Sequence, residues 1–82
     1  MNQSRIARKT PQQQAEIFLV SLNWIEMNAT PKSFKCFGTM QKHLWEKFEQ
    51  YKRNGLIFYH SLDTANRHIF EAWLAEVSKQ FD

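Results

Sequence analysis

A single cysteine, Cys36, leaves this chain of 82 residues without an internal disulfide. A domain this small buries only a modest core, so it needs dense packing or an external staple such as a metal. The sequence contains no Cys and His spacing typical of a metal site. Stability must therefore come from packing, for which the chain has twelve aromatic residues: seven Phe, three Trp and two Tyr.

The composition points to helices. Gly and Pro occur only twice each, which is too few for a turn-rich β fold. No segment is apolar over the length needed to span a membrane, and the N-terminus lacks the apolar core of a signal peptide. We therefore expect one all-α domain in the cytoplasm, built as a small bundle of three long helices with a possible short connecting helix.

Two Thr-Pro pairs mark helix starts. Thr10 can cap the first helix, Pro11 suits its first position, and Gln13 completes a capping box. Apolar residues then recur with helical spacing at positions 15, 18, 22 and 25. This pattern predicts a helix from Pro11 to about Met27.

The second pair, Thr30-Pro31, precedes another stripe. Apolar residues follow at positions 34, 37, 44, 48 and 51, and Gln41 is the one polar member of the stripe. Because the stripe keeps its phase across Gly38, we favour a single helix over residues 31–53. The alternative is a split into helices over 31–37 and 39–53.

The last third of the chain predicts one more long helix. Asn54-Gly55 is expected to close the second helix with a left-handed residue. We interpret the apolar residues 56–60 as a buried connection. Ser61 or Asp63 then caps a helix with positions 62, 69, 73 and 77 facing inward and Phe70 beside them. Each long helix carries one tryptophan (Trp24, Trp45 and Trp73), so we expect a shared aromatic core.

Positive charge is concentrated in two segments. Residues 1–9 contain Arg5, Arg8 and Lys9 without an acidic residue, and residues 32–53 contain six Lys or Arg against two Glu. Localised positive charge is typical of proteins that bind polyanions. A solvated helix face with an N-terminal tail is the alternative interpretation.

A helical wheel places part of this charge on one line. Lys32, Lys35, Thr39, Lys42 and Arg53 fall opposite the apolar stripe of the second helix. The line begins at a helix N-terminus, where partial positive charge and free N–H groups suit phosphate. A helix with such a face fits the major groove of DNA, so the pattern indicates DNA binding.

The same region resembles a known family. The segment Thr30-Pro31-Lys32-Ser33-Phe34, the pair Leu44-Trp45 and the exit Gly55-Leu56 are similar to the N-terminal core-binding (SAM-like) domain of tyrosine recombinases, the phage-integrase family. Residues 61–74 are similar to the closing helix of that domain. The chain departs from the family pattern at Phe37, where a Tyr is usual, and at Gln41, where an apolar residue is usual.

The resemblance implies a DNA-binding domain of a phage-type integrase that grips recombination-site duplex DNA as one half of a clamp. It implies a flexible basic arm over residues 1–10 and a helical domain over 11–82, cut from a longer recombinase encoded by a bacterium or phage. Its partners would be double-stranded DNA and other recombinase protomers, without a cofactor, small-molecule substrate or membrane. The expected DNA contacts, from the wheel and the resemblance together, are Lys32, Ser33, Lys35, Thr39 and Lys42, with Arg67 on the outer face of the third helix and Arg5, Arg8 and Lys9 on the arm.

We expect no enzymatic activity from this chain alone. Catalysis in the family takes place in a separate C-terminal domain, and the three histidines here are not followed by the arginine of the family's His-x-x-Arg arrangement. Two other functions stay open. One is a small protein-interaction module, a regulator or inhibitor with an exposed aromatic surface formed by Phe58, Tyr59 and Trp24. The other is a helix-turn-helix DNA-binding regulator that uses the split at Gly38.

Overall fold

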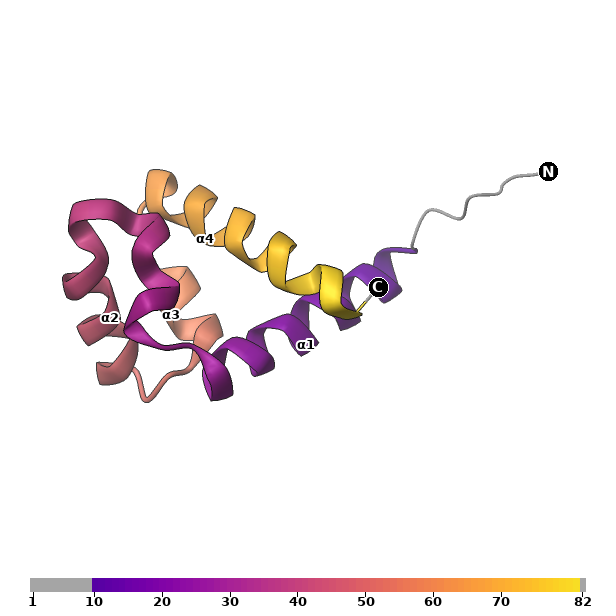
Figure 1. Ribbon diagram of the computed structural model, residues 1–82. Coiled ribbons are helices and arrows are strands. Elements are labelled where there is room, and N and C mark those ends of the chain that lie inside the picture. Colours follow the sequence, from indigo (N-terminus) through magenta and orange to yellow (C-terminus); the bar gives the residue numbers. More distant parts are fainter. Residues whose placement is uncertain (1–9, 82) are drawn as a thin grey trace.

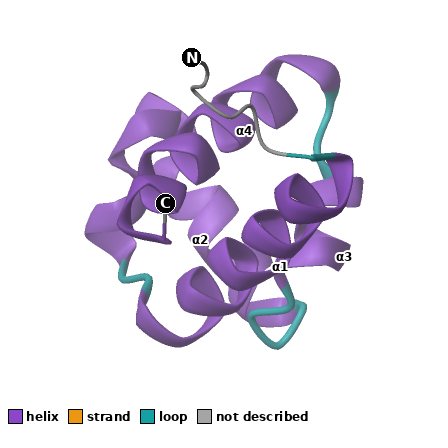
Figure 2. Ribbon diagram, turned by 90° about the vertical axis from the view of Figure 1, so that its right-hand side faces the viewer, coloured by secondary structure: helices purple, strands orange, loops and turns teal. Residues whose placement is uncertain are grey.

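The computed structural model describes residues 10–81, and every regular element in this range is helical (Figure 1). Only short connections separate the helices (Figure 2). The all-α prediction is therefore confirmed. The elements in chain order are α1 (Pro11–Asn28), the 3-10 helix η1 (Pro31–Met40), α2 (Gln41–Gln50), α3 (Gly55–Ser61), α4 (Thr64–Ser78) and the 3-10 helix η2 (Lys79–Phe81).

The first helix begins and ends as expected. The Thr10 hydroxyl accepts a hydrogen bond from the Gln13 amide at 3.1 Å, and the Gln13 side chain accepts one from the Thr10 amide at 3.0 Å. This reciprocal pair satisfies two N–H groups that a helix start leaves without partners. α1 ends at Asn28 because the chain must extend before Pro31, and Ala29 is already extended.

The single helix favoured for residues 31–53 is wrong, and the alternative split at Gly38 is close to what is observed. Gly38 has φ +59° and ψ −127°, a backbone conformation that residues with a Cβ rarely adopt. The segment before α2 is also a 3-10 helix, which has three residues per turn. Phe34 and Phe37, spaced by three, therefore lie on one face and are both buried.

The turn after α2 differs from the sequence prediction. The left-handed residues are Lys52 (φ +56°) and Arg53 (φ +58°), not Asn54-Gly55. Asn54 is extended and begins α3, because its side-chain oxygen accepts a hydrogen bond from the Ile57 amide at 3.1 Å. The expected connection over residues 56–60 is therefore the short helix α3.

Gly55 is the point at which α3 approaches α1. A Cβ atom at position 55 would lie 2.9 Å from Leu22 Cδ2, which is shorter than the contacts that Cβ atoms make in proteins. The Gly55 amide donates a hydrogen bond to the Glu26 carboxylate at 2.7 Å. A carboxylate at a helix N-terminus also interacts favourably with the helix dipole. Glu26 of α1 therefore caps α3 across the contact between the two helices.

α4 begins at Asp63, whose side chain accepts a hydrogen bond from the Asn66 amide at 2.8 Å. Its most buried side chains are Phe70, Leu74 and Val77. Of the residues expected inward, Leu62 and Val77 are buried, whereas Ile69 and Trp73 are half-buried. α4 packs along α1, and η2 also contacts α1 (Figure 1).

The aromatic core is centred on Phe34, which is completely buried. Its ring centroid lies 5.1–5.6 Å from the ring centroids of five other residues on four elements. These are Phe37, Trp45, Phe48, Phe58 and Trp73. Trp24 is half-buried against the same core. The expected shared aromatic core is thus present, with Phe34 in its middle.

Gly38→Ala should destabilise the fold through the backbone alone. No atom lies within 4 Å of a Cβ built at Gly38, so the substitution meets no steric contact. The positive φ should still make alanine unfavourable by about 1–3 kcal/mol. Urea unfolding followed by circular dichroism measures this difference, and Thr39→Ala, at the neighbouring exposed position, is the matched control. Equal unfolding midpoints for the two variants would show that Gly38 does not require its left-handed conformation.

Candidate nucleic-acid interface

Lys32 and Lys35 lie one turn apart on η1, and both are exposed. A 3-10 helix has three residues per turn, so side chains at i and i+3 are aligned along its axis. Phe34 and Phe37 point into the core and hold this helix in place. The buried phenylalanines therefore fix how the two lysines are presented to solvent.

Gln41 joins the start of α2 to the start of η1. Its side-chain amide donates a hydrogen bond to the Pro31 carbonyl at 2.6 Å, across ten residues of sequence. Pro31 precedes Lys32 and Gln41 precedes Lys42, so this hydrogen bond holds the backbone at the two lysines close together. Gln41 is the one polar member of the apolar stripe in the sequence, and in the folded chain its side chain holds the two helix starts together.

A shallow cleft of about 540 Å³ lies between these helix starts. Thr39 and Lys42 border it, and both are exposed. Two carboxylates also line it: Glu46 and Glu49 follow Lys42 by one and two turns on the same face of α2. The full lining is Pro31, Gly38, Thr39, Gln41, Lys42, Trp45, Glu46 and Glu49.

We call Lys32, Lys35, Thr39 and Lys42 the basic surface. Among residues 10–81, the ion pair found is Lys79–Glu76 on α4 and η2, with 3.2 Å between the charged atoms. The three lysines of the basic surface are therefore not neutralised by an ion pair within this part of the chain. Glu46 and Glu49 limit the positive potential on the α2 side, so the strongest potential lies towards η1.

Ser33 and Arg67, also expected to contact DNA, are engaged within the fold. Ser33 is half-buried, and its hydroxyl accepts a hydrogen bond from the Thr30 amide at 3.1 Å. Arg67 is half-buried rather than on the outer face of α4: it donates to the Leu62 carbonyl at 3.1 Å and lies 5.6 Å from the ring centroid of Tyr59.

Arg53 does not belong to the basic surface either. Its guanidinium donates to the Ala29 carbonyl at the end of α1 and lies 5.3 Å from the centre of the Trp45 ring. The helical wheel assumes one continuous helix through Gly38. Because the helix breaks there, the wheel places Arg53 on the wrong face. Arg5, Arg8 and Lys9 lie outside the described residues.

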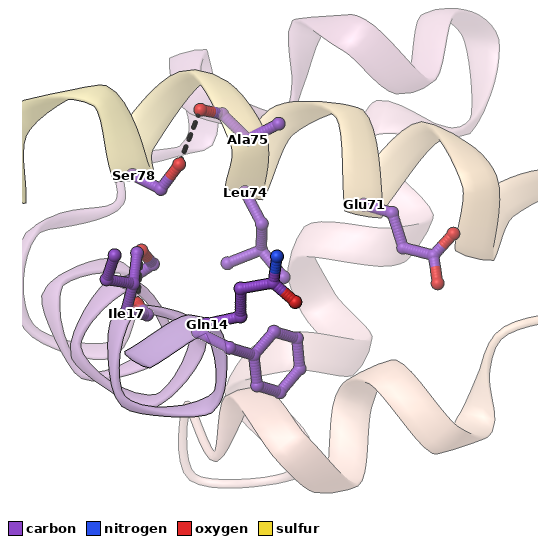
Figure 3. A pocket seen from close by; sticks show the side chains of 8 residues that line it. Gln14, Ile17, Glu71, Leu74, Ala75 and Ser78 are labelled. Atoms are coloured by element: carbon purple, nitrogen blue, oxygen red, sulfur yellow. Dashed lines mark hydrogen bonds between the residues drawn. The ribbon is translucent and has the colours of Figure 1, made fainter. Parts of the chain in front are cut away.

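A second pocket lies between α1 and α4 and has a volume of about 430 Å³ (Figure 3). Ile17 lines it from α1 and Leu74 from α4, and Gln14, Glu71 and Ser78 add polar side chains to the lining (Figure 3). The Ser78 hydroxyl donates to the Ala75 carbonyl at 2.7 Å and so is already satisfied within α4. The pocket contains none of the residues of the basic surface.

The titratable side chains of the described residues do not form a reactive cluster. No group of three or more His, Cys, Asp or Glu within residues 10–81 is arranged to hold a metal ion. Cys36 lies at the exposed surface of η1, and desolvation by its neighbours raises the pKa of its thiol. The thiol is therefore protonated near neutral pH. In the same part of the chain, none of the helices has the length and apolar character needed to cross a membrane.

Comparison with known protein families, with curated proteins and with solved structures finds no match to this chain. The aromatic surface expected for a protein-interaction module is not present, because Phe58 is fully buried and Tyr59 and Trp24 are half-buried. Among residues 10–81, the large exposed apolar side chains are aliphatic or Met: Leu19, Val20, Met27, Met40, Leu56 and Ile57.

Tyr59 provides a pH-dependent contact between α3 and α4. Its hydroxyl donates to the Glu71 carboxylate at 2.6 Å, and this hydrogen bond raises the pKa of Tyr59 above its usual 10.0. The folded state therefore holds this proton more tightly than the unfolded chain does. The resulting stabilisation is complete below the unfolded pKa and is lost as pH rises through the folded pKa.

Tyr59→Phe should lower the free energy of unfolding by about 0.5–1.5 kcal/mol at pH 7, because the hydrogen bond is lost. The difference in the free energy of unfolding between this variant and the parent chain should shrink as pH rises beyond the pKa of Tyr59. Urea unfolding at a series of pH values measures both effects. Tyr51→Phe is the control, since the Tyr51 hydroxyl makes no hydrogen bond within residues 10–81. A Tyr59→Phe difference that stays constant into strongly alkaline solution would contradict this account.

Proposed function

We propose that this chain binds duplex DNA through the basic surface and acts as the DNA-binding domain of a tyrosine recombinase. The observation that carries the proposal is the arrangement of Lys32, Lys35 and Lys42: all three are exposed, and none is in an ion pair within residues 10–81. Phe34 and Phe37 hold the backbone that carries Lys32 and Lys35, so less backbone freedom is lost when these lysines contact phosphates.

The helix starts add to this potential. η1 begins at Pro31 and α2 at Gln41, and the hydrogen bond from Gln41 to the Pro31 carbonyl holds the two starts together. Each start carries the positive end of a helix dipole, which favours a nearby anion. Thr39 adds a hydroxyl at the edge of the cleft, and threonine is a common phosphate ligand.

The resemblance to the recombinase core-binding domain supports the same surface. The segment Thr30-Pro31-Lys32-Ser33 stands where that family begins its DNA-facing helix. The helix differs here, because it is a 3-10 helix and bends at Gly38. Under this proposal the bend directs Lys42 towards the same phosphates as Lys32. Glu46 and Glu49 mark the limit of the contact on α2, because carboxylates repel the DNA backbone.

The proposal predicts weak, salt-dependent binding to random-sequence duplex DNA. Three neutralised phosphates correspond to a slope of about −3 when log affinity is plotted against log salt concentration. Changing Lys32 and Lys42 to Glu should reduce affinity by roughly tenfold or more while the helix content measured by circular dichroism stays the same. Fluorescence anisotropy with labelled DNA measures the slope and the affinity.

The matched control changes Lys52 and Lys79 to Glu, which alters net charge equally at two exposed positions outside the basic surface. This control should lose much less affinity than the variant at Lys32 and Lys42. Equal losses in the two variants would mean that overall charge, and not the basic surface, determines binding. Absence of any binding at low salt would overturn the proposed function itself.

A further inference from the structure

Asn54-Gly55 is the one Asn-Gly pair among the five asparagines of this chain. An asparagine before glycine deamidates far more readily than one before a larger residue, because no Cβ hinders the approach of the glycine nitrogen. In this reaction the Gly55 nitrogen attacks Cγ of Asn54, a new C–N bond forms, and ammonia leaves with the proton of the attacking amide. Water then opens the resulting succinimide ring, which leaves aspartate or isoaspartate at position 54.

The folded chain holds both reacting groups in other contacts. The Gly55 amide donates a hydrogen bond to the Glu26 carboxylate at 2.7 Å, and the Asn54 side-chain oxygen accepts one from the Ile57 amide at 3.1 Å. Ring closure requires the Asn54 side chain to leave the Ile57 amide and to turn its Cγ towards the Gly55 nitrogen. The cap of α3 therefore opposes the reaction.

The backbone of this pair is also fixed on both sides. The Asn54 amide donates to the Tyr51 carbonyl, and the Asn54 carbonyl accepts from the Phe58 amide, each at 3.0 Å. Gly55 is buried where α3 approaches α1, so close to Leu22 that even a Cβ atom would not fit. The rearrangement that forms the ring therefore requires a local opening in which α3 moves away from α1.

We propose that Asn54 is a deamidation site controlled by the contact between α3 and α1, protected while Glu26 caps α3 and reactive when α3 opens. In the isoaspartate product, one methylene group of the side chain becomes part of the main chain. Position 54 can then no longer cap the Ile57 amide and at the same time set Gly55 against Leu22. The reaction thus makes a transient opening of α3 permanent. The proposal does not depend on DNA binding.

Incubation of the full chain in mildly alkaline buffer tests the protection by the fold. Cleavage after Glu at mildly acidic pH releases residues 50–71, and mass spectrometry of this peptide follows Asn54, with Asn66 as an internal reference that does not precede glycine. In guanidinium chloride Asn54 should react much faster than Asn66. In the folded chain Asn54 should react roughly tenfold or more slowly than in the unfolded chain. Equal rates at Asn54 in the folded and unfolded chains, or equal rates at the two asparagines in the unfolded chain, overturn the proposal.

Replacing Glu26 tests the role of the contact with α1. Glu26→Ala removes the acceptor of the Gly55 amide, so the folded variant should deamidate at Asn54 about tenfold faster than the parent chain. Glu16→Ala is the matched control, because it removes the other acidic residue of α1, at an exposed position, and should leave the rate unchanged. Circular dichroism shows whether both variants are folded, and the comparison of folded and unfolded parent chain needs neither. An unchanged or slower rate in Glu26→Ala, or equal acceleration in both variants, contradicts control by this contact.

The isoaspartate form, separated by chromatography and refolded, tests the consequence for α3. Hydrogen exchange at the Ile57 and Phe58 amides, both within α3, should be roughly tenfold or more faster than in the parent chain. Asn54→Asp is the matched control, since it keeps the length of the main chain and a side-chain oxygen for the cap, and should keep the protection. Exchange in the isoaspartate form that equals exchange in Asn54→Asp would show that α3 is not released.

Discussion

The packing around Phe34 is the interaction on which the rest of this structure depends. Its ring touches aromatic side chains of η1, α2, α3 and α4, so one completely buried residue joins four of the six elements. Two of these contacts, with Trp45 and Trp73, are edge-on, an arrangement that aromatic pairs prefer. A chain without disulfides, and with no metal cluster among residues 10–81, gains its order from this dense contact.

α1 joins this centre by polar contacts at its C-terminal end as well as by apolar packing. Glu26 caps the start of α3, and the Arg53 guanidinium donates to the Ala29 carbonyl just beyond α1. Both contacts match a charge to the helix end of opposite polarity. Arg53 also stacks on Trp45, which links the end of α1 to α2. The two left-handed residues of the turn, Lys52 and Arg53, bring this guanidinium back over the core.

The sequence predicts the fold well where local signals act alone. Thr10-Pro11, with Gln13, is sufficient to begin α1, and Asp63 is sufficient to begin α4, since each cap is formed within one turn. The prediction fails where distant residues decide the conformation. The apolar spacing of Phe34 and Phe37 suits an α-helix and a 3-10 helix equally, and the bend at Gly38 depends on how both rings enter the core. α3 is too short to show a helical period, and its cap includes Glu26, 29 residues earlier in the chain.

The fold places the segments with and without positive charge on different helices. No Lys or Arg occurs between positions 10 and 31, the region that forms α1, whereas six occur between 32 and 53. α1 therefore presents a face without positive charge, and the helix starts that follow present lysines. A surface that binds phosphate must keep its charges exposed and unpaired, so the proposed DNA contact lies at the helix starts of η1 and α2 and not on α1.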